Sequence, residues 1–149
     1  MNIDLVKKLR QETGQGVMEC RKALQEAGGD FEKAKQILAS KVEKIATKKS
    51  ERTVKSGMVE VYSHSGKIGV IVEVLCESDF VARNPEFKEF AHELALQIAS
   101  MDPKDIDELK KEPWIRDESK TIGDLIKEKI MKFGENIKIN RFCRVELRR

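Results

Sequence analysis

The sequence contains few of the residues that hold metals or form disulfide frameworks. Its cysteines, Cys20, Cys76 and Cys143, number three and are far apart, and no two of them form a CxxC pair. His64 and His92 are 28 residues apart, so they do not form a histidine pair at the spacing of a helical metal site. We therefore expect free, buried thiols and predict no metal and no cofactor.

Long hydrophobic runs and a strong excess of one charge are also missing. No apolar stretch approaches the roughly 20 residues that cross a bilayer, and Met1 leads into Asn2-Ile3-Asp4 without the apolar core of a signal peptide. The net charge is only +3, from 29 basic and 26 acidic residues. That balance is atypical of proteins that coat nucleic acid. We expect a cytoplasmic protein with no membrane and no direct nucleic-acid partner.

Motifs of catalysis are absent as well. The sequence has no G-x-x-x-x-G-K-[ST] phosphate loop, no G-x-G-x-x-G and no G-x-S-x-G. Neighbouring carboxylates, such as Asp105 with Asp107, lie in polar stretches that favour exposed side chains over a buried acid–base pair. We predict a binding protein, not an enzyme.

The first 40 residues show three stretches of helical periodicity separated by glycines. The first ends at Thr13-Gly14-Gln15-Gly16 and the second at Gly28-Gly29, where glycine permits a tight reversal. Asp30 fits the N-cap of the third. The inward stripes are Leu5, Val6 and Leu9, then Val17, Cys20, Leu24 and Ala27, then Phe31, Ala34, Ile37 and Leu38. We predict a three-helix domain over residues 1–40 with a small core.

Residues 41–55 are rich in basic side chains and poor in apolar ones. The basic residues are Lys41, Lys44, Lys48, Lys49, Arg52 and Lys55. A short stripe of Val42, Ile45 and Ala46 indicates helix, so we predict a basic helical linker that loosens into an exposed segment. A solvated charged face accounts for this composition. The alternative is a strip that contacts RNA, which would make the chain an RNA-associated helical binding module.

From Ser56 onward, alternation replaces helical periodicity. Val59 and Val61 alternate with more polar residues, and a Gly-containing turn at 63–67 precedes a valine-rich strand at 68–76. These two strands predict an antiparallel hairpin. We expect a third strand at 142–147, with Cys143, Val145 and Leu147 on one face.

Helical patterns fill the chain between the second and third strands. We predict one helix from Pro85, capped by Asn84, a short one from Asp102-Pro103, and a longer one from Ile122 that ends at Gly134. Strands at both ends with helices between them predict an α+β core over residues 56–149, with a three-stranded antiparallel sheet covered by helices on one face.

The segment from Ser78 to Asn84 is unusual for a connection. It follows a buried strand, yet it contains Phe80 and Val81 between Asp79 and Arg83. One interpretation is that Phe80 folds back over the sheet as a lid. The other is that Phe80 is an aromatic anchor for a partner, flanked by charges that set its register.

Three motifs, in order along the chain, resemble the elongation factor Ts family over essentially the whole length. They are Leu9-Arg10-Gln11-Glu12-Thr13-Gly14 with Gly16 and Met18-Glu19-Cys20-Arg21-Lys22-Ala23-Leu24, then Ser78-Asp79-Phe80-Val81-Ala82-Arg83-Asn84, then Gly134-Glu135-Asn136-Ile137. The family implies a ubiquitin-associated (UBA)-type three-helix domain followed by an α+β core. It also implies a function as a guanine-nucleotide exchange factor that binds the GTPase elongation factor Tu and promotes release of GDP.

The resemblance also implies which residues meet the partner. Asp79 and Phe80, with the adjacent Val81, match the segment that the family inserts near the Mg²⁺ and phosphate site of elongation factor Tu. The matching positions in the N-terminal module are Arg10, Val17, Met18 and Arg21. This sequence departs from the common pattern at Ser78, where threonine is usual, and at Val17, where methionine is usual.

Many family members carry two related core subdomains, whereas this chain has one. The short forms resemble half of that arrangement, so the resemblance implies a homodimer formed through uncovered sheet edges and helix faces. A ubiquitin-type adaptor is a further alternative, suggested only by the three N-terminal helices.

Overall fold

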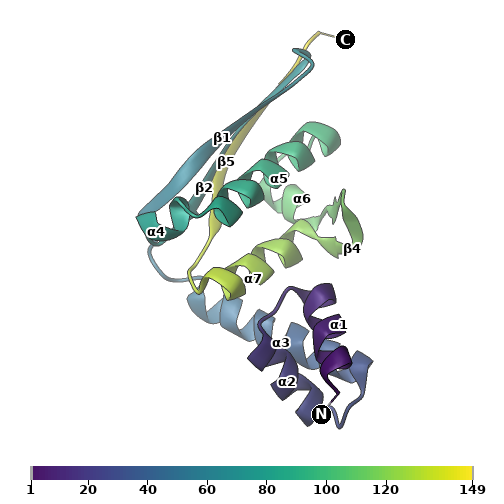
Figure 1. Cartoon of the computed structure of the whole chain (residues 1–149). Helices are drawn as coiled ribbons and strands as arrows, with labels where there is room; N and C mark the ends of the chain where they lie inside the picture. Colours follow the sequence, from purple (N-terminus) through teal and green to yellow (C-terminus); the bar gives the residue numbers. More distant parts are fainter. Residues whose placement is uncertain (1, 149) are drawn as a thin grey trace. The chain divides into compact units, whose positions relative to one another are not determined.

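The structure is a computed structural model that describes residues 2–148 (Figure 1). Its contacts divide the chain into two units. The N-terminal unit comprises Met1–Glu51 and Lys127–Gly134, and the core unit comprises Arg52–Ile126 and Glu135–Arg149. Each unit is described by itself below.

Three helices open the N-terminal unit, as the sequence predicts. They are α1 (Ile3–Thr13), α2 (Val17–Glu26) and α3 (Phe31–Lys49). Asn2 caps α1 by accepting the N–H of Asp4 at 2.9 Å, and Asp30 caps α3 by accepting the N–H of Lys33 at 3.1 Å. Gly14 ends α1 in the left-handed conformation, at φ 71°. Local capping chemistry therefore sets where these helices begin and end.

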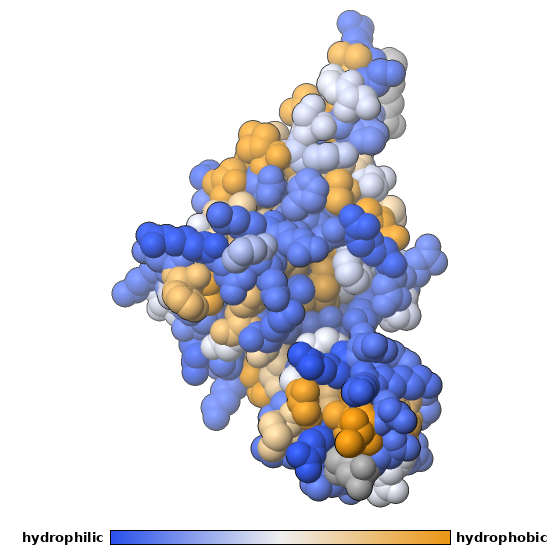
Figure 2. Space-filling model, in the orientation of Figure 1, coloured by the Kyte–Doolittle hydropathy of each residue, from blue (hydrophilic) through white to orange (hydrophobic). Residues whose placement is uncertain are grey.

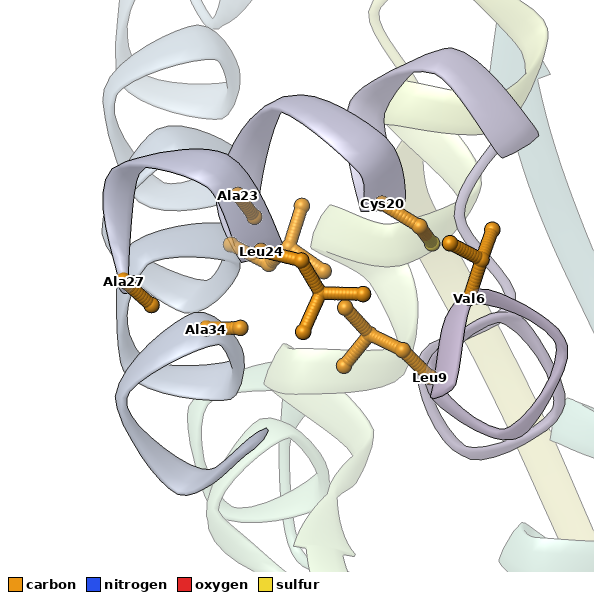
Figure 3. Close-up of a cluster of buried hydrophobic side chains, with 8 residues drawn as sticks. Val6, Leu9, Cys20, Ala23, Leu24, Ala27 and Ala34 are labelled. Atoms are coloured by element: carbon orange, nitrogen blue, oxygen red, sulfur yellow. The ribbon is translucent and has the colours of Figure 1, made fainter. Parts of the chain in front are cut away.

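A small cluster of buried side chains holds these helices together (Figure 3). Leu5, Phe31 and Ile37 are partly buried against it. The members of the cluster are Val6, Leu9, Cys20, Ala23, Leu24, Ala27, Ala34 and Leu38. Val17 was expected in the inward stripe but is 43% exposed, because it lies at the first turn of α2 outside this cluster.

Helix α3 passes residue 40 without a break and ends at Lys49. Val42 and Ala46 are buried on its inner side, so the apolar stripe that begins at Ala34 continues along the whole helix. The segment 41–55, predicted as a helical linker, is therefore one helix with residues 31–40 as far as Lys49.

The core unit is built on a three-stranded antiparallel sheet, which confirms the α+β prediction. Its strands are β1 (Ser56–His64), β2 (Ile68–Cys76) and β5 (Lys138–Glu146), in the order β1-β2-β5. In this register Val61 lies opposite Ile71, and Ile71 lies opposite Cys143. The third strand begins at Lys138, earlier than the predicted residue 142, because Ile139 continues the buried side of the strand.

The two faces of this sheet differ sharply. Val70, Val72 and Val74 are buried on one face, and α5 (Pro85–Met101) packs against β1 and β2 (Figure 1). The other face carries Val59, Val61, Ile71, Val145 and Leu147, all at least half exposed. The alternation in the sequence thus produced one covered and one open face.

Short elements in the core unit correct two sequence predictions and add one hairpin. The segment after β2 is not a loop but contains a one-turn helix, α4 (Asp79–Ala82). Asp102 does not start a helix; it ends α5 in the left-handed conformation, and α6 (Ile106–Lys111) is capped by Asp105. The strands β3 (Pro113–Trp114) and β4 (Asp117–Thr121) form a small hairpin that was not predicted.

The helix predicted from Ile122 is present as α7 (Ile122–Phe133), and Gly134 follows it at φ 71°. Among residues 2–148, no helix has both the length and the apolar composition needed to cross a membrane.

Candidate partner-binding site

A single turn of helix carries the central residues of the candidate site. Ser78 caps α4 with its side-chain oxygen, which accepts the N–H of Val81 at 3.3 Å. Val81 and Ala82 are buried and pack α4 onto the core unit. A four-residue helix is not stable alone in water, so its neighbours must hold this turn.

Phe80 points away from the protein. It is 84% exposed, whereas Phe87 and Phe90 of α5 are almost completely buried. The lid interpretation of Phe80 is therefore wrong. Helical geometry explains the result, because the side of the turn that packs on the core is occupied by Val81 and Ala82. Exposed aromatic rings of this kind are typical of residues that bind a partner.

Asp79 lies beside Phe80 at the first position of α4. Its Oδ1 accepts the hydroxyl of Ser56, the first residue of β1, at 2.6 Å. Asp79 is exposed, and its negative charge at the start of a helix is electrostatically favourable. The hydrogen bond from Ser56 therefore orients the carboxylate of Asp79 next to the exposed ring of Phe80.

Glu135, 57 residues after Ser78, contacts the backbone at the start of this turn. Its Oε1 accepts the N–H groups of Glu77 and Ser78 at 3.1 and 3.0 Å, and its Oε2 accepts the Ser78 hydroxyl at 2.6 Å. The second and third sequence motifs therefore meet in space. The sequence did not predict this contact, and its only sign was the presence of Gly-Glu-Asn just after a helix end.

Asn136 donates two hydrogen bonds beside the same turn. The N–H of Asn136 donates to the carboxylate of Glu77, and Arg52 approaches that carboxylate at 3.7 Å. The side-chain amide of Asn136, a residue only 1% exposed, donates to the carbonyl of Arg52 at 2.9 Å. Buried polar groups with defined partners of this kind fix the local backbone.

The cysteines separate into two buried thiols and one exposed thiol. Cys76, at the end of β2, donates to the carbonyl of Ser78 at 3.2 Å. Burial, reinforced by the charge of Glu135, raises the pKa of Cys76, and burial also raises the pKa of Cys20. Both therefore stay protonated at neutral pH. Cys143 was expected to be buried but is exposed, because it lies on the uncovered face of β5.

The four predicted N-terminal residues are all exposed. Arg10 lies in the last turn of α1, and Arg21 lies in the middle of α2. Val17 and Met18 begin α2 and are 43% and 60% exposed. Figure 2 shows hydrophobic surface over the N-terminal helices amid hydrophilic surface. These residues belong to the N-terminal unit, whereas Asp79, Phe80 and Val81 belong to the core unit.

The chemistry of these residues favours recognition. Within residues 2–148, no group of three or more histidine, cysteine or acidic side chains is arranged to hold a metal ion. The prominent features are a rigidly held turn and exposed apolar and charged side chains. Fold and site together define an α+β protein with an exposed aromatic side chain on a turn whose backbone is held by hydrogen bonds.

Sequence similarity to known proteins identifies one family within this class. The family model described as Elongation factor TS matches residues 77–149, which include both the Phe80 turn and Glu135. A protein of Coprothermobacter proteolyticus named Elongation factor Ts is 43% identical, over 97% of this chain and 96% of its own length. Another of that name from Rubrobacter xylanophilus is 39% identical, over 97% and 98% of the two chains. The chain belongs to the elongation factor Ts family.

The relatives differ from this chain in length. The alignments with these two proteins run over 190 and 191 positions, more than the 149 residues of this chain, so these relatives carry segments without a counterpart here. A longer relative from Clostridium kluyveri is 48% identical over 95% of this chain, which spans 46% of that protein.

Proposed function

We propose that this protein is a guanine-nucleotide exchange factor, not an enzyme, and that it acts in the cytoplasm by binding elongation factor Tu and promoting release of GDP. Membership of the elongation factor Ts family supports the partner. The observation that carries the mechanism is the exposure of Phe80, at 84%, on a turn whose backbone is held by Glu135. The turn presents this ring to a partner without first rearranging.

Exchange requires the factor to favour the nucleotide-free form of the GTPase. Because binding is reciprocal, a factor that weakens GDP binding is itself bound less tightly when GDP is present. Weakening the affinity for GDP about a thousandfold corresponds to a coupling free energy of about 4 kcal/mol between the two binding events. Burying one phenylalanine supplies roughly 1.5–3 kcal/mol, so Phe80 needs help from neighbouring groups.

Asp79 supplies the second contribution in this mechanism. Its carboxylate stands next to Phe80 and is oriented by Ser56 at 2.6 Å. Brought near the Mg²⁺ and phosphate site, a carboxylate competes for magnesium and repels phosphate. Val81 has a different role: it is 5% exposed and anchors the turn from inside, so its contribution to partner binding is indirect.

The N-terminal unit provides anchorage in this proposal. We assign Arg10, Val17, Met18 and Arg21 to the surface that contacts the nucleotide-binding domain of elongation factor Tu. Their exposure supports this assignment. The three helices and their small core are consistent with a UBA-like module, which we include in the proposal. Because these residues only hold the complex together, they need not distinguish its nucleotide states.

We also propose that the protein forms a homodimer through the uncovered face of the sheet. Val61, Ile71 and Cys143 form a row across the three strands, and Val59, Val145 and Leu147 extend the exposed apolar surface on both sides. The single core subdomain supports a second copy as the occupant. A symmetric pair of such faces would bury both surfaces at once.

Several basic side chains of segment 41–55, which the RNA-binding alternative would use, have partners within the protein. Lys41 pairs with Glu26 at 3.1 Å, and Lys49 donates to the carbonyl of Gly134 at 2.7 Å. Arg52 faces Glu77. Half of the basic side chains in this segment therefore have partners within the protein.

Stopped-flow fluorescence tests the proposed function. Elongation factor Tu loaded with fluorescent GDP is mixed with this protein and excess unlabelled GDP, and unlabelled GDP alone serves as the control. We expect release to accelerate with protein concentration and to saturate. A release rate that stays at the control value at micromolar concentrations would refute the exchange function. Salt-dependent retention of the protein on RNA under the same conditions would favour the alternative.

A further inference from the structure

We propose that Glu135 is a positioning residue, which holds the Phe80 turn in its docking orientation before the GTPase arrives. The inference rests on the exchange function proposed above and assigns a role within it to the Gly-Glu-Asn motif. Glu135 does not lie on α4 and is 55 residues from Phe80 in the chain. It acts through the two residues that precede Asp79, namely Glu77 and Ser78.

The first argument is that Glu135 sets the orientation of the capping hydroxyl. An ionised carboxylate can only accept hydrogen bonds, so Ser78 must donate its hydroxyl proton to Glu135, at 2.6 Å. A lone pair of the same oxygen then faces the N–H of Val81, at 3.3 Å. Glu135 thereby fixes the cap of the turn in the one direction that supports α4.

The second argument is that the carboxylate holds the backbone on the N-terminal side of the turn. Its Oε1 accepts two successive N–H groups, from Glu77 and Ser78. Hydrogen bonds from backbone N–H groups to a carboxylate are stronger than neutral ones. Phe80 follows Ser78 by two residues, so its position is determined by a strand end on one side and by buried Val81 on the other.

The third argument is that the contact is reciprocal. While Glu135 accepts from residues 77 and 78, the next residue, Asn136, donates its N–H to Glu77 and its side-chain amide to the carbonyl of Arg52. This exchange fixes the register of segment 135–136 against segment 77–78. All of these residues belong to the core unit.

The test combines Glu135→Ala with Phe80→Ala in a double-mutant cycle of GDP release from elongation factor Tu. Charge-assisted hydrogen bonds of this strength predict that Glu135→Ala lowers the maximal release rate at saturating protein about tenfold. In the Phe80→Ala background, the same change should have a clearly smaller effect, because the ring is gone and only Asp79 remains for Glu135 to position. An equal effect in both backgrounds, or an unchanged rate for Glu135→Ala, would overturn the inference.

Two measurements separate positioning from loss of fold and from failure of the proposed function. Glu135→Gln keeps an acceptor oxygen, so it should promote GDP release at a rate between the rates for wild type and for Glu135→Ala. Glu118→Ala, at an exposed site on β4, is the control and should not change the rate. Amide hydrogen exchange needs no GTPase: Glu135→Ala should accelerate exchange at Val81 and leave the N–H groups of α5 protected. Protection at Val81 that persists in Glu135→Ala would overturn the inference even if the wild-type protein proved inactive in nucleotide release.

Discussion

Gly57 lies against the backbone of Val74 on the neighbouring strand. A Cβ atom at Gly57 would be 2.2 Å from the carbonyl oxygen of Val74 and 2.8 Å from the Cα of Leu75. The φ angle of Gly57 is 151°, in the region that favours glycine. This close approach brings the start of β1, with Ser56, next to Asp79. Gly57 therefore contributes to the geometry of the candidate site as well as to the sheet.

Replacing Gly57 with alanine should destabilise the core unit. The new methyl group would clash with backbone that cannot move aside cheaply, and the φ angle would add strain, for a total of roughly 2–4 kcal/mol. Chemical denaturation followed by circular dichroism measures this loss. Gly69→Ala is the matched control, because a Cβ at Gly69 meets nothing within 4 Å. Equal stabilities of the two variants would contradict the steric explanation.

Glu112 should make the stability of the protein depend on pH. Burial raises its pKa above the ordinary value of 4.5, the nearby charges of Glu108 and Asp102 add to this effect, and the hydrogen bond from Gln97 opposes it. Because the folded state then binds the proton more tightly than the unfolded state, this contribution to stability is present below pH 4.5 and is lost as the pH rises through the folded pKa.

Glu112→Gln should therefore be more stable than wild type at pH 7, and the difference should shrink as the pH falls toward 4. Urea unfolding at a series of pH values measures it. Glu118→Gln, at an exposed site, should show no such trend. A Glu112→Gln advantage that grows toward acidic pH would reverse the predicted sign.

Met18→Ala should weaken the complex with elongation factor Tu without changing the maximal rate of GDP release. Met18 is 60% exposed at the start of α2, and losing its contact should cost about 1–2 kcal/mol, or roughly tenfold in half-saturating concentration. Titration in the nucleotide-release assay separates the two quantities. Ile3→Ala removes a residue that is 68% exposed on α1 and is the control. A lower maximal rate for Met18→Ala would show that the N-terminal unit does more than anchor.

Val61→Glu should convert the proposed homodimer into a monomer. The new carboxylate would lie at the β1 end of the apolar row that Val61 forms with Ile71 and Cys143, where pairing of two copies would bury it without a partner. Size-exclusion chromatography with light scattering gives the mass directly. Ile115→Glu changes an exposed apolar residue outside the three-stranded sheet and is the control. A dimer that survives Val61→Glu would exclude this face as the interface.

Local patterns predicted the regular parts of the fold. The alternation of Val70, Val72 and Val74 gives a strand, and Asn84 before Pro85 starts a helix, because these signals depend on neighbours in the chain. The small elements were missed for the opposite reason. The one turn of α4 is capped by Ser78, whose hydroxyl donates to Glu135, and the β3–β4 hairpin is tied to Gln97 of α5 through the N–H of Ile115, at 3.0 Å. Contacts so distant in sequence leave no local periodicity.

The sequence predicted which residues belong to the candidate site but not which of them are buried or what they contact. An aromatic residue in a polar connection identified Phe80, and its exposure agrees with the anchor interpretation. Val81 shared the same motif, yet it faces inward because successive residues of a helical turn point in different directions. Asn136 belongs to the third motif, but no local pattern predicted that it is buried against Arg52.

The central claim is tested most directly by Phe80→Ala, assayed by stopped-flow release of fluorescent GDP from elongation factor Tu at saturating protein. Because the ring is 84% exposed, the free energy of unfolding of the variant should lie within about 0.5 kcal/mol of that of wild type. Ile115→Ala is the matched control at another exposed residue. Loss of the buried ring in the complex should slow the maximal release rate by roughly 10- to 100-fold. A folded Phe80→Ala protein that releases GDP at the wild-type rate would contradict the mechanism.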